Sequence, residues 1–66
     1  MNKKLEFGKK MKEARTEQGK TQADCAIHCG VCLETYQRWE WGLSMPKNDK
    51  LENICDFLGM RSESWQ

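Results

Sequence analysis

The stretch TQADCAIHCGVCLETYQRWEWG constrains the fold of this 66-residue chain more than any other segment. Thr21 is a suitable helix N-cap, and Asp24 stands three residues later as a short relative of the capping-box glutamate. Small and apolar residues then predict a helix from Gln22 to His28 or Cys29. Gly30 is expected to end this helix, because glycine adopts a positive φ at little cost.

A second short helix is predicted directly after this Gly-Val turn. Cys32 stands at its N-cap position, the helix should run from Leu33 to about Trp41, and Gly42 should end it. Two aromatic residues are spaced to face the core: Tyr36 and Trp39. The polar residues between them should point outward: Glu34, Thr35, Gln37 and Arg38. The segment therefore predicts two short helices joined by a tight turn.

Helices are also predicted on both sides of this pair. The first should span about Lys3 to Gln18 and stop at Gly19. A fourth should follow Pro46, with Asp49 as its cap and an apolar stripe at positions 51, 54, 55 and 58. Ser62 is a candidate cap for a last short turn that brings Trp65 back onto the body.

No segment shows the sustained alternation of a half-buried strand, so the prediction is an all-α fold. A chain of this length makes one domain at most, and residues 1–66 are expected to form a single compact bundle of four to five short helices. No run of about 18 apolar residues is present, and the basic start MNKKLEFGKK lacks an apolar segment behind it. We therefore expect a cytoplasmic protein without membrane association.

Charge is unevenly distributed along the chain, although the formal net charge is only +1. Residues 1–20 carry seven basic groups against three acidic ones, whereas residues 21–45 hold Arg38 against three acidic groups. Attraction of phosphate would therefore depend on the first helix, Lys47, Lys50 and helix N-termini. A solvated lysine face explains the N-terminal excess about as well.

A series of short motifs follows one another at characteristic spacing. They are G-K-K-M-K-E-A-R at 8–15, T-Q at 21–22, G-V at 30–31, R-W-E at 38–40, glycine at 42, proline at 46 and L-x-x-I-C-x-x-L-G-M from 51. In this order they resemble the helix-turn-helix domain of the phage repressor and Cro family of transcriptional regulators, also called the xenobiotic-response-element family. The resemblance covers about Phe7 to Met60 and implies a lambda repressor-like bundle that binds double-stranded DNA, with a homodimer as the expected form.

The resemblance also implies roles for individual residues. Leu33, Glu34 and Arg38 occupy positions that reach base edges, and Gln22 would touch a phosphate while bracing the recognition helix. Thr35 and Gln37 would lie nearer the DNA backbone. The full set expected at the DNA is Thr21, Gln22, Leu33, Glu34, Thr35, Gln37, Arg38, Lys47 and Asn48. Arg15 and Glu40 match a partly buried salt bridge between the first helix and the end of the third.

The acidic balance of residues 21–45, together with Leu33, supports a different function for the same fold. Leu33 cannot hydrogen-bond a base, and Glu34 would face phosphates from the groove. The alternative is a protein-interaction module that binds a partner such as a toxin. Trp65, with Leu43, Met45 and Met60, could form an apolar patch for pairing, or Trp65 could pack on its own domain.

Cys25, Cys29 and Cys32 are spaced CxxxCxxC, the pattern by which radical enzymes that use S-adenosylmethionine hold an iron–sulfur cluster. A zinc site that adds Cys55 or His28 is a second possibility. Because helical spacing places these thiols among apolar positions, we interpret them as reduced core residues, with no metal and no cofactor. No arrangement of catalytic residues stands out, so we expect neither an enzyme nor a small-molecule substrate.

Overall fold

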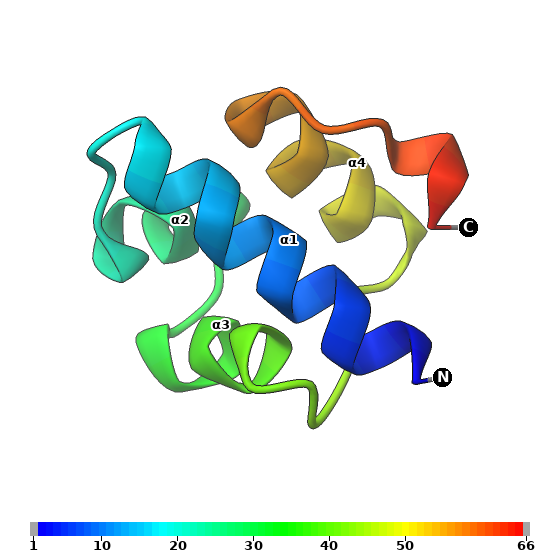
Figure 1. The fold of residues 1–66 in the computed structure, drawn as a ribbon. Coiled ribbons are helices and arrows are strands. Elements are labelled where there is room, and N and C mark those ends of the chain that lie inside the picture. Colours follow the sequence, from blue (N-terminus) through cyan, green and yellow to red (C-terminus); the bar gives the residue numbers. More distant parts are fainter. Residues whose placement is uncertain (1, 66) are drawn as a thin grey trace.

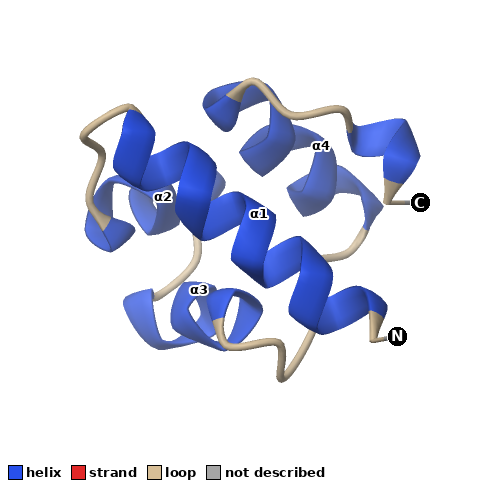
Figure 2. Cartoon of the chain, in the orientation of Figure 1, coloured by secondary structure: helices blue, strands red, loops and turns tan. Residues whose placement is uncertain are grey.

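The computed structural model describes residues 2–65 and contains four α-helices and a short 3₁₀ helix within that range (Figure 1). Their bounds are α1 Lys3–Glu17, α2 Gln22–Cys29, α3 Leu33–Glu40, α4 Asn48–Leu58 and η1 Ser62–Ser64. Figure 2 shows only helices and loops over the described residues, which confirms the predicted all-α bundle. None of these helices has the length and apolar character needed to cross a bilayer.

The cap signals at the start and end of α2 act as predicted. Thr21 Oγ1 accepts from the Asp24 backbone N–H at 3.0 Å, and Asp24 Oδ2 accepts from the Thr21 N–H at 2.9 Å. Gly30 then ends α2 at φ 70°. Because both ends of α2 are determined by local chemistry, the direction in which the chain enters α3 is determined as well.

The predicted cap of α4 is wrong. The helix begins at Asn48 with Lys47 at the N-cap position, and no side chain caps it. The chain turns into the helix immediately after the buried Pro46, so Asp49 lies within the first turn. There its negative charge interacts favourably with the helix dipole, but its side chain does not cap a backbone N–H group. Likewise, Arg61 rather than Ser62 occupies the cap position of η1.

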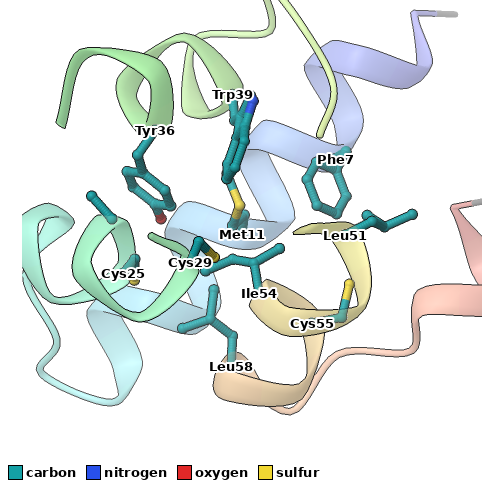
Figure 3. Close-up of a cluster of buried hydrophobic side chains, with 11 residues drawn as sticks. Phe7, Met11, Cys25, Cys29, Tyr36, Trp39, Leu51, Ile54, Cys55 and Leu58 are labelled. Carbon is teal, nitrogen blue, oxygen red and sulfur yellow. The ribbon is translucent and has the colours of Figure 1, made fainter. Parts of the chain in front are cut away.

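The four α-helices bury one apolar core, which Figure 3 shows in close-up. Each contributes from one face, and the buried hydrophobic residues are Phe7, Met11, Cys25, Ala26, Cys29, Tyr36, Trp39, Leu51, Ile54, Cys55 and Leu58. Three of the four cysteines belong to this buried set, namely Cys25, Cys29 and Cys55, and Figure 3 labels them in the cluster. They therefore act as small hydrophobic residues, as interpreted from the sequence.

A close approach of α1 and α3 depends on Gly8. A Cβ built at Gly8 would lie 2.5 Å from the carbonyl oxygens of both Trp39 and Glu40. Any larger residue would have to push the end of α3 away from α1. This contact places the C-terminal turn of α3 against α1, where Glu40 meets its partners.

The C-terminal segment returns to the body as expected. The Trp65 ring packs edge-on against Phe7, with ring centroids 5.2 Å apart. Met45 and Met60 are also partly buried against the core, whereas Leu43 is 64% exposed. Most residues of the apolar patch considered for pairing, namely Trp65, Met45 and Met60, therefore pack against the core of their own chain.

Candidate nucleic-acid interface

The helix-turn-helix unit consists of α2, the turn at Gly30–Cys32 and α3. α3 packs against both α1 and α2, and its opposite face is directed outward (Figure 1). Tyr36, Trp39 and Glu40 are its buried residues, whereas Leu33, Glu34 and Arg38 are exposed. One face of α3 is therefore packed against α1 and α2, and the opposite face is exposed to solvent.

A buried carboxylate fastens α3 to the rest of the molecule. Glu40 Oε2 accepts from Arg15 Nε and from the Tyr36 hydroxyl, each at 2.6 Å. Glu40 Oε1 accepts from Gln22 Nε2 at 3.0 Å and from Arg15 Nη2 at 3.3 Å. Its side chain is 2% exposed, and that of Arg15 is 12% exposed. The ion pair implied by the family resemblance is thus formed, and it joins α1, α2 and α3 at one point.

The network keeps Glu40 ionised. Burial opposes the charge, but the hydrogen bonds from Arg15, Tyr36 and Gln22 outweigh it, so the pKa of Glu40 lies below its ordinary value. The hydrogen bond to Glu40 raises the pKa of Arg15. Burial and the same carboxylate raise the pKa of Tyr36, which stays protonated and donates. Glu40 is therefore purely a hydrogen-bond acceptor.

The network continues from Glu40 to the outer side of α3. Gln22, which donates to Glu40, also accepts from Gln37 Nε2 at 3.1 Å through its Oε1. Gln37 is consequently half-buried rather than fully outward-pointing as predicted. The bracing expected of Gln22 is present, and it acts on Gln37 and Glu40.

The exposed face of α3 carries an ion pair of its own. Arg38 Nη2 lies 3.1 Å from Glu34 Oε1, and both side chains are mostly exposed. Leu33 is 44% exposed beside them. Thr35 is half-buried on the other flank, with its Oγ1 3.1 Å from the Sγ of Cys32. At the N-cap position, Cys32 makes no side-chain cap to the backbone.

The polar residues near this face differ in whether they are exposed or hydrogen-bonded within the protein. Lys47 and Asn48 are exposed at the start of α4, as is Thr21 at the start of α2. Lys50, expected to attract phosphate, instead donates to the Cys29 carbonyl oxygen at 2.8 Å. It is half-buried, and it satisfies a carbonyl in the last turn of α2. This contact gives Lys50 a structural role between α4 and α2.

Lys20 is engaged in a similar way. Its Nζ donates to the Phe57 carbonyl oxygen at 2.6 Å and lies 4.0 Å from the centroid of that ring. His28 stacks on the same ring at 4.2 Å and is itself exposed. Neither lysine contact could be predicted from the sequence, because both join residues far apart in the chain and leave no local signal.

The cysteines do not converge on one point. Cys25, Cys29 and Cys55 are buried, whereas Cys32 is exposed at the start of α3. Within residues 2–65 no group of three or more His, Cys, Asp or Glu side chains is arranged to hold a metal ion. The CxxxCxxC spacing thus directs two thiols to the core and one to solvent, which does not suit a shared cluster.

Exposed apolar side chains are a further feature of this surface. Trp41 and Leu43 follow α3 at 57% and 64% exposure, and Leu5 of α1 packs against Gly42 between them. Ile27, on the outer face of α2, is 78% exposed. The apolar character of Trp41 and Leu43 was visible in the sequence, but their exposure depends on how the loop leaves α3.

These elements define a helix-turn-helix protein of the kind that binds DNA. A family model described as a helix-turn-helix domain matches residues 6–64, nearly the whole chain, and the protein belongs to this family. No curated protein and no solved structure matches the chain as a relative. DNA binding and transcription regulation are the general functions of such domains.

Proposed function

We propose that the protein binds double-stranded DNA sequence-specifically as a cytoplasmic transcriptional regulator of the repressor and Cro type. The whole chain, residues 1–66, would act as one domain that reads the major groove with α3. The observation that supports this most directly is that α3 is fixed to its neighbours on one face and exposed to solvent on the other. Glu40 joins α3 to α1 and α2, while Leu33, Glu34 and Arg38 remain exposed. A major groove admits one such helix and rewards side chains that bond base edges.

Each exposed residue has a role in this proposal. Arg38 can donate to guanine O6 and N7, and Glu34 can accept from the cytosine amino group. Leu33 can contact a thymine methyl group. Thr35 would contact the DNA backbone, and so would the three residues at helix starts: Thr21, Lys47 and Asn48.

The ion pair between Glu34 and Arg38 is compatible with this role. Both side chains are largely exposed, so the pair contributes little to stability and can open at low cost. The Glu34 carboxylate offsets the charge of Arg38 until a guanine offers Arg38 a better partner. The expected result is weak binding to random DNA and better binding to a matching site.

We further propose that the protein acts as a homodimer on a two-fold operator, of the sort found in phage or plasmid regulation. The two recognition helices would then lie about 34 Å apart, one turn of DNA. Leu43, with Trp41 and Leu5 nearby, offers exposed apolar area for such pairing.

The proposal is tested by titrating the protein with duplexes from its own upstream region at several salt concentrations. Affinity should fall steeply as salt rises, because phosphate contacts release counterions. Arg38→Ala should reduce the preference for the matching duplex over a scrambled one by roughly 5- to 150-fold, the equivalent of about 1–3 kcal/mol. Binding that is absent at low salt, or that does not respond to salt, would exclude the proposal.

A protein-interaction module is the second candidate, and the exposed apolar residues favour it. Leu33, Trp41 and Leu43 are all well exposed on or just after α3. The module would bind a partner such as a toxin through this face. Stable co-purification with the product of a neighbouring gene, together with no duplex shift at low salt, would support this candidate over DNA binding.

A further inference from the structure

The hydrogen-bond chain from Glu40 to Gln37 has a single allowed polarity. Glu40, as a carboxylate, can only accept. Gln22 must therefore direct its Nε2 toward Glu40, as the 3.0 Å contact shows. Its Oε1 is then left for Gln37, which must donate from Nε2 at 3.1 Å. The buried charge thus determines the orientation of two successive amides.

The carbonyl oxygen of Gln37 is consequently turned away from Gln22. Within residues 2–65 this oxygen has no hydrogen-bond partner in the protein, and no buried side-chain oxygen there is left unsatisfied. The Oε1 of the half-buried Gln37 therefore reaches solvent. On α3, Gln37 lies one turn after Leu33 and three residues after Glu34, both exposed, so Gln37 borders the exposed face of the helix.

A free glutamine amide can rotate by half a turn and present either its oxygen or its nitrogen. Here that rotation would bring the Gln37 oxygen against the Gln22 oxygen and lose a hydrogen bond. Rotating Gln22 as well would bring its oxygen against the carboxylate of Glu40, whose Oε2 is already held by Arg15 and Tyr36. Both rotations leave an acceptor facing an acceptor, which is unfavourable in a part-buried site.

Base edges in the major groove differ in what they offer such a fixed acceptor. Adenine N6 and cytosine N4 carry amino groups that donate, whereas guanine O6 and N7 and thymine O4 accept. We propose that Gln37 is a specificity-determining residue that accepts a hydrogen bond from the amino group of adenine or cytosine. Gln22 is the positioning residue that holds its amide in this orientation. This inference rests on the proposed DNA binding.

The test begins with the full-length protein and a random duplex library, from which the tightest-binding sequence is selected. Within that sequence each adenine is replaced in turn by purine, and each cytosine by pyrimidinone, which removes only the amino group. At one position this removal should lower the affinity of the wild type roughly 5- to 150-fold. For Gln37→Ala the same removal should change affinity by less than about twofold.

Two further variants separate reading from positioning. Gln22→Met removes the amide that orients Gln37, together with a hydrogen bond to Glu40. It should lower overall affinity and reduce the sensitivity to the same amino group by a larger factor than the discrimination at any other position. A purely structural role for Gln22 would instead weaken all positions together. Asn53→Ala removes an exposed side-chain amide on α4, outside the residues proposed to contact DNA, and is the control that should keep the full sensitivity.

The outcomes distinguish this inference from the proposed function. If no duplex is enriched from the library, sequence-specific DNA binding itself is excluded. If a sequence is enriched but Gln37→Ala stays as sensitive to every amino group as the wild type, the role of Gln37 is excluded while DNA binding stands. If the Gln37 contact depends on purine N7, measured with 7-deaza bases, and on no amino group, Gln37 donates and the inferred polarity is wrong.

Discussion

Arg15 and Glu40 form a part-buried ion pair in which Nε and Oε2 lie 2.6 Å apart. The two residues come from α1 and the end of α3, separated by 25 positions in the chain. Arg15 also donates from Nη1 to the Lys20 carbonyl oxygen at 3.0 Å, so it ties the α1–α2 turn to the same point. The pair is therefore the main polar connection between α1 and α3, the proposed recognition helix.

Removal of Arg15 should destabilise the fold strongly. Arg15→Met would leave the buried Glu40 charge without its cation, a loss of about 3–5 kcal/mol in the free energy of unfolding. Arg38→Met removes an exposed ion pair and should cost less than about 0.5 kcal/mol. Urea denaturation followed by circular dichroism measures both. Equal losses for the two variants would contradict the central role of the buried pair.

A milder change tests the same network if Arg15→Met does not fold. Tyr36→Phe removes one hydrogen bond to the charged Glu40 and keeps the ring in the core. We expect a loss of about 1.5–3 kcal/mol in the free energy of unfolding. An unchanged urea midpoint would show that the Tyr36 hydroxyl contributes nothing to holding Glu40.

Stability should decrease in acid because of the same carboxylate. The pKa of Glu40 is lower in the folded state than in the unfolded chain, where glutamate titrates near about 4.3. The stabilisation is therefore complete above the unfolded value and is lost as pH falls through the folded one. Carboxyl NMR titration should find the pKa of Glu40 below that of free glutamate.

Asp24 contributes to this acid dependence, so it serves as the comparison. Its hydrogen bonds with Thr21 also lower its pKa. Asp24→Asn should remove only part of the fall in stability between about pH 5 and pH 2, leaving the part due to Glu40. Complete loss of the acid dependence in Asp24→Asn would mean that Glu40 does not titrate as its contacts require.

Much of the fold could be predicted, because its signals are local. Thr21 with Asp24, and Gly30 after Cys29, identify the ends of α2 through contacts within a few residues. The start of α4 was predicted less well, since the sequence is compatible with an N-cap at either Asp49 or Lys47. Only the position of the buried Pro46 in the packed loop decides between them.

The candidate site could be predicted only in part. The exposed face around Arg38 follows from helical periodicity, and the Arg15–Glu40 pair follows from the family resemblance. The link from Glu40 through Gln22 to Gln37 joins residues 18 and 15 positions apart, which no local pattern reveals. The engagement of Lys50 by the end of α2, over 21 positions, was missed for the same reason.

Gly8 should be sensitive to even the smallest substitution. In an ordinary helix interior, glycine to alanine stabilises by about 0.5–1 kcal/mol. At Gly8 the added methyl group would meet two backbone carbonyl oxygens of α3, so Gly8→Ala should instead destabilise by about 1–3 kcal/mol. Thr16→Ala, exposed in the same helix, is the control and should be neutral or slightly stabilising. Stabilisation by Gly8→Ala would show that the two helices separate easily.

The cysteines should differ sharply in reactivity. The Thr35 hydroxyl lowers the pKa of the exposed Cys32, whereas burial raises the pKa of Cys55 to about 11 and those of Cys25 and Cys29 as well. Because the thiolate is the reactive form, iodoacetamide at pH 8 should label Cys32 first. Mass spectrometry of the folded protein should find a single fast-reacting site, absent from Cys32→Ser. Comparable labelling of all four thiols would contradict the core role of the other three.

Substitution of two lysines near the start of α4 should affect DNA binding differently. Lys47 is exposed and would contact a phosphate, so Lys47→Ala should weaken binding to all duplexes alike and lower the salt slope by about 1. Lys50 holds the Cys29 carbonyl oxygen, so Lys50→Ala should lower the melting temperature and leave the salt slope unchanged. Titrations between about 50 and 200 mM salt, with a thermal melt of each variant, separate the two effects. An equal change of slope in both variants would place Lys50 at the DNA and contradict its structural role.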